Sequence, residues 1–409
     1  MPTPLTQRIL KKIQSATGWK LSEPDYCPQV VSKLKAYQQQ HQNLQTIFND
    51  LLSQAPYLPD VKWDEPFMSS PYYKDITNAP KDIFDNLYDA KEEARKKLEE
   101  LKKYVYELLI LQIEKIISIK EQYKSQVEVL TQSNILEQLS NGEMGIRGVD
   151  GKEYPLPTYQ EVLGRFKDQE KRTLLEKKVK QGFTKLLLVP FAMPLSVLLE
   201  RHKEVLLKTY KESGIKSTDG TRLELNINDP LFVWEDLVQG DNPDTDKSQQ
   251  IEYGVKTYDA DTKESRGGKY KSELLKDPDN AWQILLLENS PDLPAENKGK
   301  TISGRKQIEA GQTPKYYLKL LQTQEQYQGE TGLTPEANLT LYLDGLTRNR
   351  IALDDFRGKG RCNWLVGNYL SGSVPYFRWD CDSISQTYLS GENPDYYHDF
   401  VGFRPSVRF

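Results

Sequence analysis

Residues 374–409 read VPYFRWDCDSISQTYLSGENPDYYHDFVGFRPSVRF, and this stretch decides how the rest of the chain is interpreted. No lysine follows Lys359, although lysine is abundant upstream, and Tyr, Asp, Ser, Asn and Phe are concentrated here. Flat aromatic side chains give large contact areas at low entropic cost, and short polar side chains give adaptable hydrogen bonds. The composition therefore favours a binding surface. A core strand would alternate apolar and polar residues, and this stretch shows little such alternation. We therefore predict irregular loops held on a compact scaffold.

The bulk properties narrow the class of protein. A chain of 409 residues has room for several domains. Its net charge of −4 and pI of about 5.7 argue against nucleic-acid binding, which requires a concentrated positive surface. Its mean hydropathy of −0.69 indicates that much of the chain is solvated helix or loop. No apolar run approaches the roughly 18 residues of a membrane span, and the first residues do not resemble a signal peptide. We expect a cytoplasmic protein by default, and display at the cell surface by another route stays open.

Residues that could hold a metal or perform catalysis are few and scattered. The cysteines are Cys27, Cys362 and Cys381, and the histidines are His41, His202 and His398. Their spacing matches no zinc motif and no paired nucleophile and base. We therefore expect no metal, no cofactor and no enzymatic activity, and we interpret His398 as a contact residue in an aromatic loop.

The segment KGKTISGRK, residues 298–306, has the composition of a phosphate-binding loop without its spacing. Such a loop needs a glycine at a fixed distance before the Gly-Lys pair so that backbone amides can surround the phosphates, and Ala295 and its neighbours Pro294 and Glu296 stand there instead. We interpret this segment as a solvated basic loop.

The spacing of apolar residues, together with the proline- and glycine-rich segments that interrupt it, divides the chain into three regions. Residues 1–79 contain short helices and a proline-rich connector, and 80–145 carry a long helix or coiled-coil element that continues to about Ser140. The glycine-rich segment Asn141–Gly151 marks the boundary to a domain at 146–409, whose variable C-terminal part is about 374–404. The long helix packs within the chain or, alternatively, mediates self-association.

Within 146–409 the sequence predicts both helices and short apolar strands. Helices are expected near 158–166, 173–181 and 195–212, with a buried apolar run between the last two. Pro314 opens a further helix, and Thr334 followed by Pro335 predicts an N-cap and first turn for another.

The C-terminal half resembles a known family. The pattern comprises Trp364, Asn368-Tyr369, Val374-Pro375, Trp379, Leu389, Pro394 and Gly402-Phe403-Arg404, preceded by WEDL, AWQILLLEN, KGKTISGRKQ, TPKYYLKLLQ, GETGLTPEANLTLYLDGL and DDFRGKG. It is similar to the variable proteins of diversity-generating retroelements, which have a C-type lectin fold of the formylglycine-generating-enzyme type. The resemblance covers about 151–409. It implies an α+β chain: a helical N-terminal region with a long helix, then a C-type-lectin-like domain with short strands and much irregular loop.

The resemblance also implies a function. In that family a reverse transcriptase introduces errors at template adenines, so that AAY codons become NNY codons, which encode neither Lys, Glu, Gln, Met nor Trp. Between Tyr376 and Phe400 only Trp379, Gln386 and Glu392 fall outside the NNY set. The implied scaffold residues are Trp379, Leu389, Gly402 and Arg404. The implied variable, ligand-contacting residues are Tyr376, Phe377, Arg378, Asp380, Asp382, Tyr388, Asn393, Asp395, Tyr396, Tyr397, His398 and Phe400.

We therefore expect a diversified ligand-binding protein without enzymatic activity, whose unknown ligand is expected to be a protein. Two alternatives stay open. One is an oxidase of the formylglycine-generating type, which would need a closely spaced cysteine pair, whereas Cys362 and Cys381 are far apart. The other is a structural assembly protein organised by the long helix.

Overall fold

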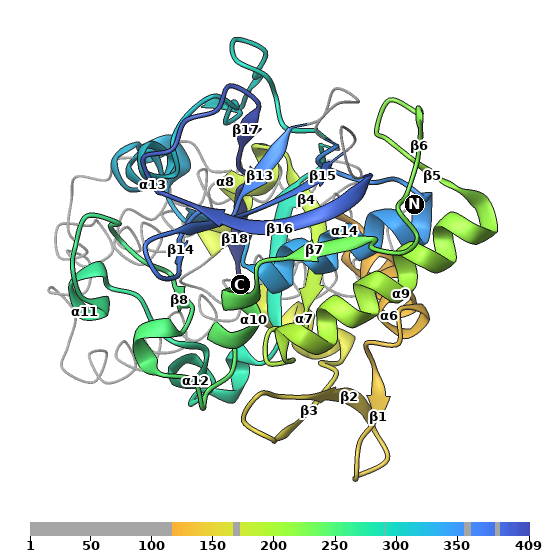
Figure 1. Ribbon diagram of the computed structural model, residues 1–409. Coiled ribbons are helices and arrows are strands. Elements are labelled where there is room, and N and C mark those ends of the chain that lie inside the picture. Colours follow the sequence, from red (N-terminus) through yellow and green to blue (C-terminus); the bar gives the residue numbers. More distant parts are fainter. Residues whose placement is uncertain (1–116, 167–171, 291, 356–360, 381–384) are drawn as a thin grey trace, which may run out of the picture. The chain divides into compact units, whose positions relative to one another are not determined.

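The computed structural model describes residues 117–166, 172–290, 292–355, 361–380 and 385–409. One compact unit runs from Ile117 to Arg165 and from Lys177 to Phe409, and it mixes helices with several small sheets (Figure 1). This confirms the α+β class. The predictions for 1–79, and most of the long helix predicted for 80–145, lie outside the described residues. No helix in the described ranges is long and apolar enough to cross a membrane.

The described α-helices are α6 (Ile119–Gln132), α7 (Tyr159–Phe166), α8 (Arg172–Lys180), α9 (Leu195–Ser213), α10 (Glu235–Gly240), α11 (Lys263–Arg266), α12 (Lys271–Leu274), α13 (Pro314–Thr323) and α14 (Pro335–Asn349). The short 3-10 helices are η3 (Lys247–Gln249), η4 (Pro278–Asn280) and η5 (Glu325–Tyr327). The strands are β1 (Glu137–Gln138), β2 (Met144–Arg147), β3 (Glu153–Pro155), β4 (Phe183–Val189), β5 (Ile215–Lys216), β6 (Arg222–Leu223), β7 (Leu231–Val233), β8 (Glu252–Tyr253), β9 (Gln283–Glu288), β10 (Thr301–Ile302), β11 (Arg305–Lys306), β12 (Glu330–Thr331), β13 (Cys362–Trp364), β14 (Asn368–Tyr369), β15 (Val374–Asp380), β16 (Gln386–Glu392), β17 (Val401–Gly402) and β18 (Ser406–Arg408).

Two sheets form the framework of the unit. The first has the order β12-β18-β9-β4 and is antiparallel throughout. The second has the order β17-β13-β15-β16-β7, in which β17 and β7 pair in parallel with their neighbours while the inner pairs are antiparallel. The apolar run predicted before α9 is strand β4, whose last four residues are buried. Figure 1 shows the β15–β16 hairpin in dark blue beside the green strand β7.

Among the described helices α14 is the most deeply buried, since every residue from Pro335 to Leu346 is buried. The predicted cap is present: the Thr334 hydroxyl accepts a hydrogen bond from the Ala337 amide, and Pro335 occupies the first turn. Two contacts attach this helix to two other elements, α6 and β15. Its Asp344 accepts a hydrogen bond of 2.9 Å from Gln126 of α6, and its Tyr342 packs against Phe377 of β15 with ring centroids 4.8 Å apart.

The segment KGKTISGRK is exposed along most of its length, as the interpretation as a solvated loop expects. It forms the β10–β11 hairpin rather than a loop, however, and its Arg305 is fully buried, so the interpretation is wrong for that residue. The Arg305 guanidinium donates two hydrogen bonds of 2.7 Å to the Glu330 carboxylate and lies 2.6 Å from a Glu288 oxygen. The Lys178 ammonium group reaches the same Glu330 carboxylate. A buried charge is stable only with such partners, and these partners come from distant parts of the sequence.

Three further expectations differ from the structure. Helix α6 ends at Gln132 rather than near Ser140, and the glycine-rich segment lies inside the compact unit, where β2 joins β1 and β3. Regular strands β15 and β16, each of seven residues, occupy part of the predicted irregular loops. The alternation typical of a strand is hidden in the sequence because aromatic residues occupy both faces of β15.

Candidate functional site

The β15–β16 hairpin separates its side chains between two faces. Phe377 and Trp379 of β15 are fully buried, whereas Tyr376 and Arg378 between them are only half-buried. On β16 the pattern repeats, because Leu389 is fully buried and Tyr388 is half-buried. Successive side chains of a strand point to opposite faces. One face of the hairpin therefore belongs to the core. The other face carries Tyr376, Arg378 and Tyr388 at half-buried positions, while its ends at Val374, Asp380 and Gln386 are buried.

An aromatic stack covers the outward face. Tyr388 pairs in register with Phe232 of β7, and their rings stack with centroids 4.3 Å apart and planes at 11°. Tyr376 continues the stack at 6.1 Å from Tyr388. The Arg378 guanidinium lies 4.9 Å from the Tyr388 centroid, within the range of a cation–π contact, and donates a 2.8 Å hydrogen bond to Asp380. We call Phe232, Tyr376, Arg378 and Tyr388 the aromatic face.

A second group of aromatic side chains lies on the loop of residues 393–400, which we call the tyrosine loop. Tyr396 and Tyr397 are 41% and 55% exposed, values that few large hydrophobic side chains in the described ranges reach. The Tyr396 hydroxyl lies 2.8 Å from Nε2 of His398, and the His398 ring contacts that of Phe400 with centroids 4.4 Å apart. These contacts hold the aromatic side chains while leaving the two tyrosines open to solvent.

Helix α13 holds the start of the tyrosine loop. The Lys315 amide donates a 3.2 Å hydrogen bond to the Pro394 carbonyl, and the Lys315 ammonium group lies 3.5 Å from the Asp395 carboxylate. Tyr316 of the same helix turn is 47% exposed. The loop and the first turn of α13 therefore present exposed tyrosines close to one another.

The aromatic face and the tyrosine loop rest on the same buried cluster. Tyr376 and Phe400 both pack against the cluster that contains Trp364, Tyr317 and Phe403. The Trp364 and Tyr376 rings meet at 5.4 Å and 72°. Burial raises the pKa of Tyr376 to about 12, so its hydroxyl stays protonated at neutral pH and can donate a hydrogen bond. A rigid apolar support lies beneath both groups.

Most of the residues predicted to contact a ligand lie at the surface, but not all. Phe377 is fully buried between Tyr342 and His202, so its assignment to an exposed face is wrong. Asp380 is also buried, and its carboxylate pairs with Arg378. Asp382 lies outside the described residues. The remaining predicted residues are half-buried or exposed: Tyr376, Arg378, Tyr388, Asn393, Asp395, Tyr396, Tyr397, His398 and Phe400.

Sequence reasoning missed Phe232, which is 37% exposed. Its segment was predicted only as a short apolar piece, and nothing in a single sequence shows that β7 pairs in parallel with β16. The residues expected as scaffold are all buried. Trp379 and Leu389 are fully buried, an added Cβ at Gly402 would come within 3.1 Å of the Ala310 Cα, and Arg404 donates a 2.8 Å hydrogen bond to Asp354.

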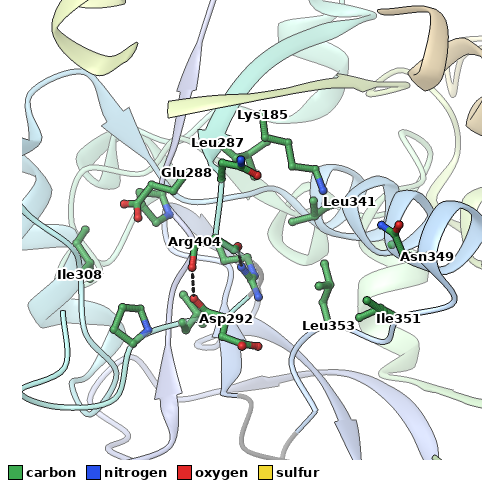
Figure 2. A pocket seen from close by; sticks show the side chains of 16 residues that line it. Lys185, Leu287, Glu288, Asp292, Ile308, Leu341, Asn349, Ile351, Leu353 and Arg404 are labelled. Atoms are coloured by element: carbon green, nitrogen blue, oxygen red, sulfur yellow. Dashed lines mark hydrogen bonds between the residues drawn. The ribbon is translucent and has the colours of Figure 1, made fainter. Parts of the chain in front are cut away.

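A cavity of about 190 Å³ lies beside Arg404 (Figure 2). Apolar side chains, among them Leu341 and Leu353, line it together with charged residues. Its cations already have partners: Lys185 lies 2.8 Å from Asp344, and Arg404 is bound to Asp354. The cavity therefore offers a ligand little uncommitted positive charge.

Cys362 is a free, fully buried thiol, and burial raises its pKa. A thiol with a raised pKa is a poor nucleophile. Cys27 and Cys381 lie outside the described residues. Within the described ranges, no group of three or more His, Cys, Asp or Glu side chains is placed to hold a metal ion.

Comparison of the chain with known protein families, with curated proteins and with solved structures found no match.

Proposed function

We propose that this chain is a diversified ligand-binding protein, and that the aromatic face and the tyrosine loop contact the ligand, which is a protein. The observation that carries the proposal is the division of the β15–β16 hairpin. Its inward residues build the core, whereas its outward residues stack as flat aromatics beside a guanidinium group. Tyr, Trp and Arg supply much of the binding energy at protein interfaces, because they bury large areas and retain polar groups.

The same division would allow diversification without loss of the fold. Replacing an outward side chain leaves the core contacts of its neighbours in place, while the strand hydrogen bonds depend only on the backbone. A domain of the C-type lectin type, which the resemblance implies, is part of this proposal. The mixed α+β unit, with short strands and a C-terminal hairpin at its surface, supports it.

Sequencing the 3′ end of the gene from many cells of the source population tests the proposal. We expect substitutions that arise at adenines and that concentrate in the codons for the outward residues, such as Tyr376, Tyr388 and Tyr397. The adjacent inward positions Trp379 and Leu389 provide the internal control and should stay constant. We also expect a near-repeat of this DNA, differing at adenines, beside a reverse transcriptase gene.

Phe377 makes the test sharper. Phenylalanine is one of the residues that NNY codons encode, so diversification could produce it at this position. Its side chain is nevertheless fully buried. The proposal therefore requires Phe377 to vary far less than Tyr376 and Arg378 on either side. Variation spread evenly over inward and outward codons, or no excess at adenines, would contradict the proposal.

A further inference from the structure

A second cavity, of about 310 Å³, lies where the β14–β8 pair approaches the ends of β9 and β18. This volume is at the lower end of the range for small-molecule sites. None of the predicted ligand-contacting residues lines it. The lining residues are Tyr253, Gly254, Lys256, Gly267, Lys269, Leu274, Gln283, Leu285, Thr331, Gly332, Thr334, Val366, Gly367, Asn368, Ser406 and Arg408.

The charged residues that line this cavity are all positive. Lys256, Lys269 and Arg408 contribute three cations, and no Asp or Glu is among the lining residues. In the part of the chain that the structure describes, none of the three forms an ion pair. The Arg408 guanidinium donates a 2.7 Å hydrogen bond to the neutral amide oxygen of Asn280. Burial, followed by the nearby Arg165, lowers the pKa of Arg408, and Asp277 opposes this shift without cancelling it, so the net effect of its surroundings is to disfavour its charge. A bound anion would relieve this unfavourable interaction.

Neutral polar groups complete the lining. The Gln283 side chain lines the cavity and is only 3% exposed. Its amide can both donate a hydrogen bond to, and accept one from, the hydroxyl groups of a ligand. Thr331 and Ser406 add hydroxyl groups to the same wall. Thr334 is the N-cap of α14, so the positive end of that helix dipole faces this region.

The cavity beside Arg404 provides a contrast within the same unit. There the lining includes the carboxylates Glu288 and Asp292, and both cations are already paired with carboxylates. The two cavities therefore differ in the property that selects an anion, which is positive charge without a protein partner.

We propose that the cavity lined by Lys256, Gln283 and Arg408 binds a small phosphate monoester of monosaccharide size. A phosphate oxygen pair matches the planar fork of an arginine, and a lysine supplies a further positive charge. The amide and hydroxyl groups suit the hydroxyl groups of a sugar. This site uses no residue of the aromatic face or the tyrosine loop, so it stands independently of the proposed protein ligand.

Isothermal titration calorimetry of the full chain tests the site with glucose 6-phosphate as the probe, and with glucose and inorganic phosphate as comparisons. We expect saturable binding of glucose 6-phosphate at one site and competition by inorganic phosphate. Glucose should bind at least about tenfold more weakly, because it lacks the charged group that the three cations select.

Substitutions of the lining residues test whether glucose 6-phosphate binds in this cavity. Arg408→Gln and Lys256→Gln should each weaken glucose 6-phosphate binding about tenfold, a difference of about 1.4 kcal/mol. Lys298→Gln is the matched control, since Lys298 is exposed and does not line the cavity. If circular dichroism shows that Arg408→Gln does not fold, Lys256→Gln decides the outcome. The proposal is overturned by an absence of saturable binding, by equal affinity for glucose, or by variants that bind as the parent chain does.

Discussion

His202 of α9 meets Phe377 of β15 edge to face in the core, with ring centroids 5.9 Å apart and planes at 88°. Tyr342 of α14 contacts both rings, at 5.2 Å from His202 and 4.8 Å from Phe377. This cluster holds the inward side of β15 against two helices. On the other side of the same strand, Tyr376 packs only partly against the cluster around Trp364, and Arg378 is half-buried. The first prediction below depends on that asymmetry.

The two faces of the hairpin should differ in their contribution to stability. Phe377→Ala removes a fully buried ring and should lower the free energy of unfolding by about 3–5 kcal/mol. Tyr388→Ala removes a half-buried ring that stacks on Phe232 and should cost about 1 kcal/mol. Urea unfolding of the two variants beside the parent chain measures the difference. Equal losses would contradict the assignment of inward and outward faces.

His202 should make the fold sensitive to acid. Burial lowers its pKa to about 3, and in the described ranges neither ring nitrogen has a hydrogen-bond partner. In the unfolded chain it binds a proton below its ordinary pKa of about 6.5. Between these two values the unfolded state holds the extra proton, so this residue lowers stability as the pH falls, by about 1.4 kcal/mol per pH unit.

His202→Phe removes this titration and retains an aromatic ring of similar size. The stability advantage of the variant over the parent chain should therefore grow as the pH falls from 6.5 towards 4. Comparing urea midpoints at several pH values cancels the contribution of the carboxylates that both chains share. Parallel pH curves for the two chains would show that His202 does not titrate in this way.

Neighbouring residues of the β10–β11 hairpin should differ strongly in how much stability is lost when their charge is removed. Arg305→Met leaves Glu330 and Glu288 buried with fewer partners and should cost about 3–5 kcal/mol. Lys306→Gln removes an exposed cation that pairs with Glu309 and should change stability by less than about 1 kcal/mol. Thermal unfolding of both variants provides the measurement. If this segment were a solvated loop, both variants would match the parent chain.

Replacing both tyrosines of the tyrosine loop should leave the fold intact. Tyr396 and Tyr397 are exposed, so each change to Ala should alter the free energy of unfolding by no more than about 0.5 kcal/mol. Tyr317→Ala is the matched control, because Tyr317 is buried and its hydroxyl donates a 2.6 Å hydrogen bond to the Glu309 carbonyl. Thermal unfolding should distinguish the two variants clearly. A large loss of stability in the loop variant would assign these tyrosines to the structural framework instead.

The sequence alone determined the elements whose signals are local. Thr334 and Pro335 specify the start of α14 because a side-chain cap and a fixed φ act within one helical turn. Apolar spacing likewise placed α7, α8 and α9 close to their observed bounds, and Pro314 marked the start of α13. Composition also identified Tyr396 and Tyr397, since exposed tyrosines in a polar loop need no distant partner to be recognised.

Only the tertiary structure decided which residues of β15 and β16 face the core, and why Arg305 is buried. Each depends on residues that lie far away in the sequence: Phe377 on His202 and Tyr342, Tyr388 on Phe232, and Arg305 on Glu288 and Glu330. The cavity around Gln283 is assembled in the same way from separate segments. Burial and pairing are properties of the folded neighbourhood, and a residue's own type and near neighbours do not contain them.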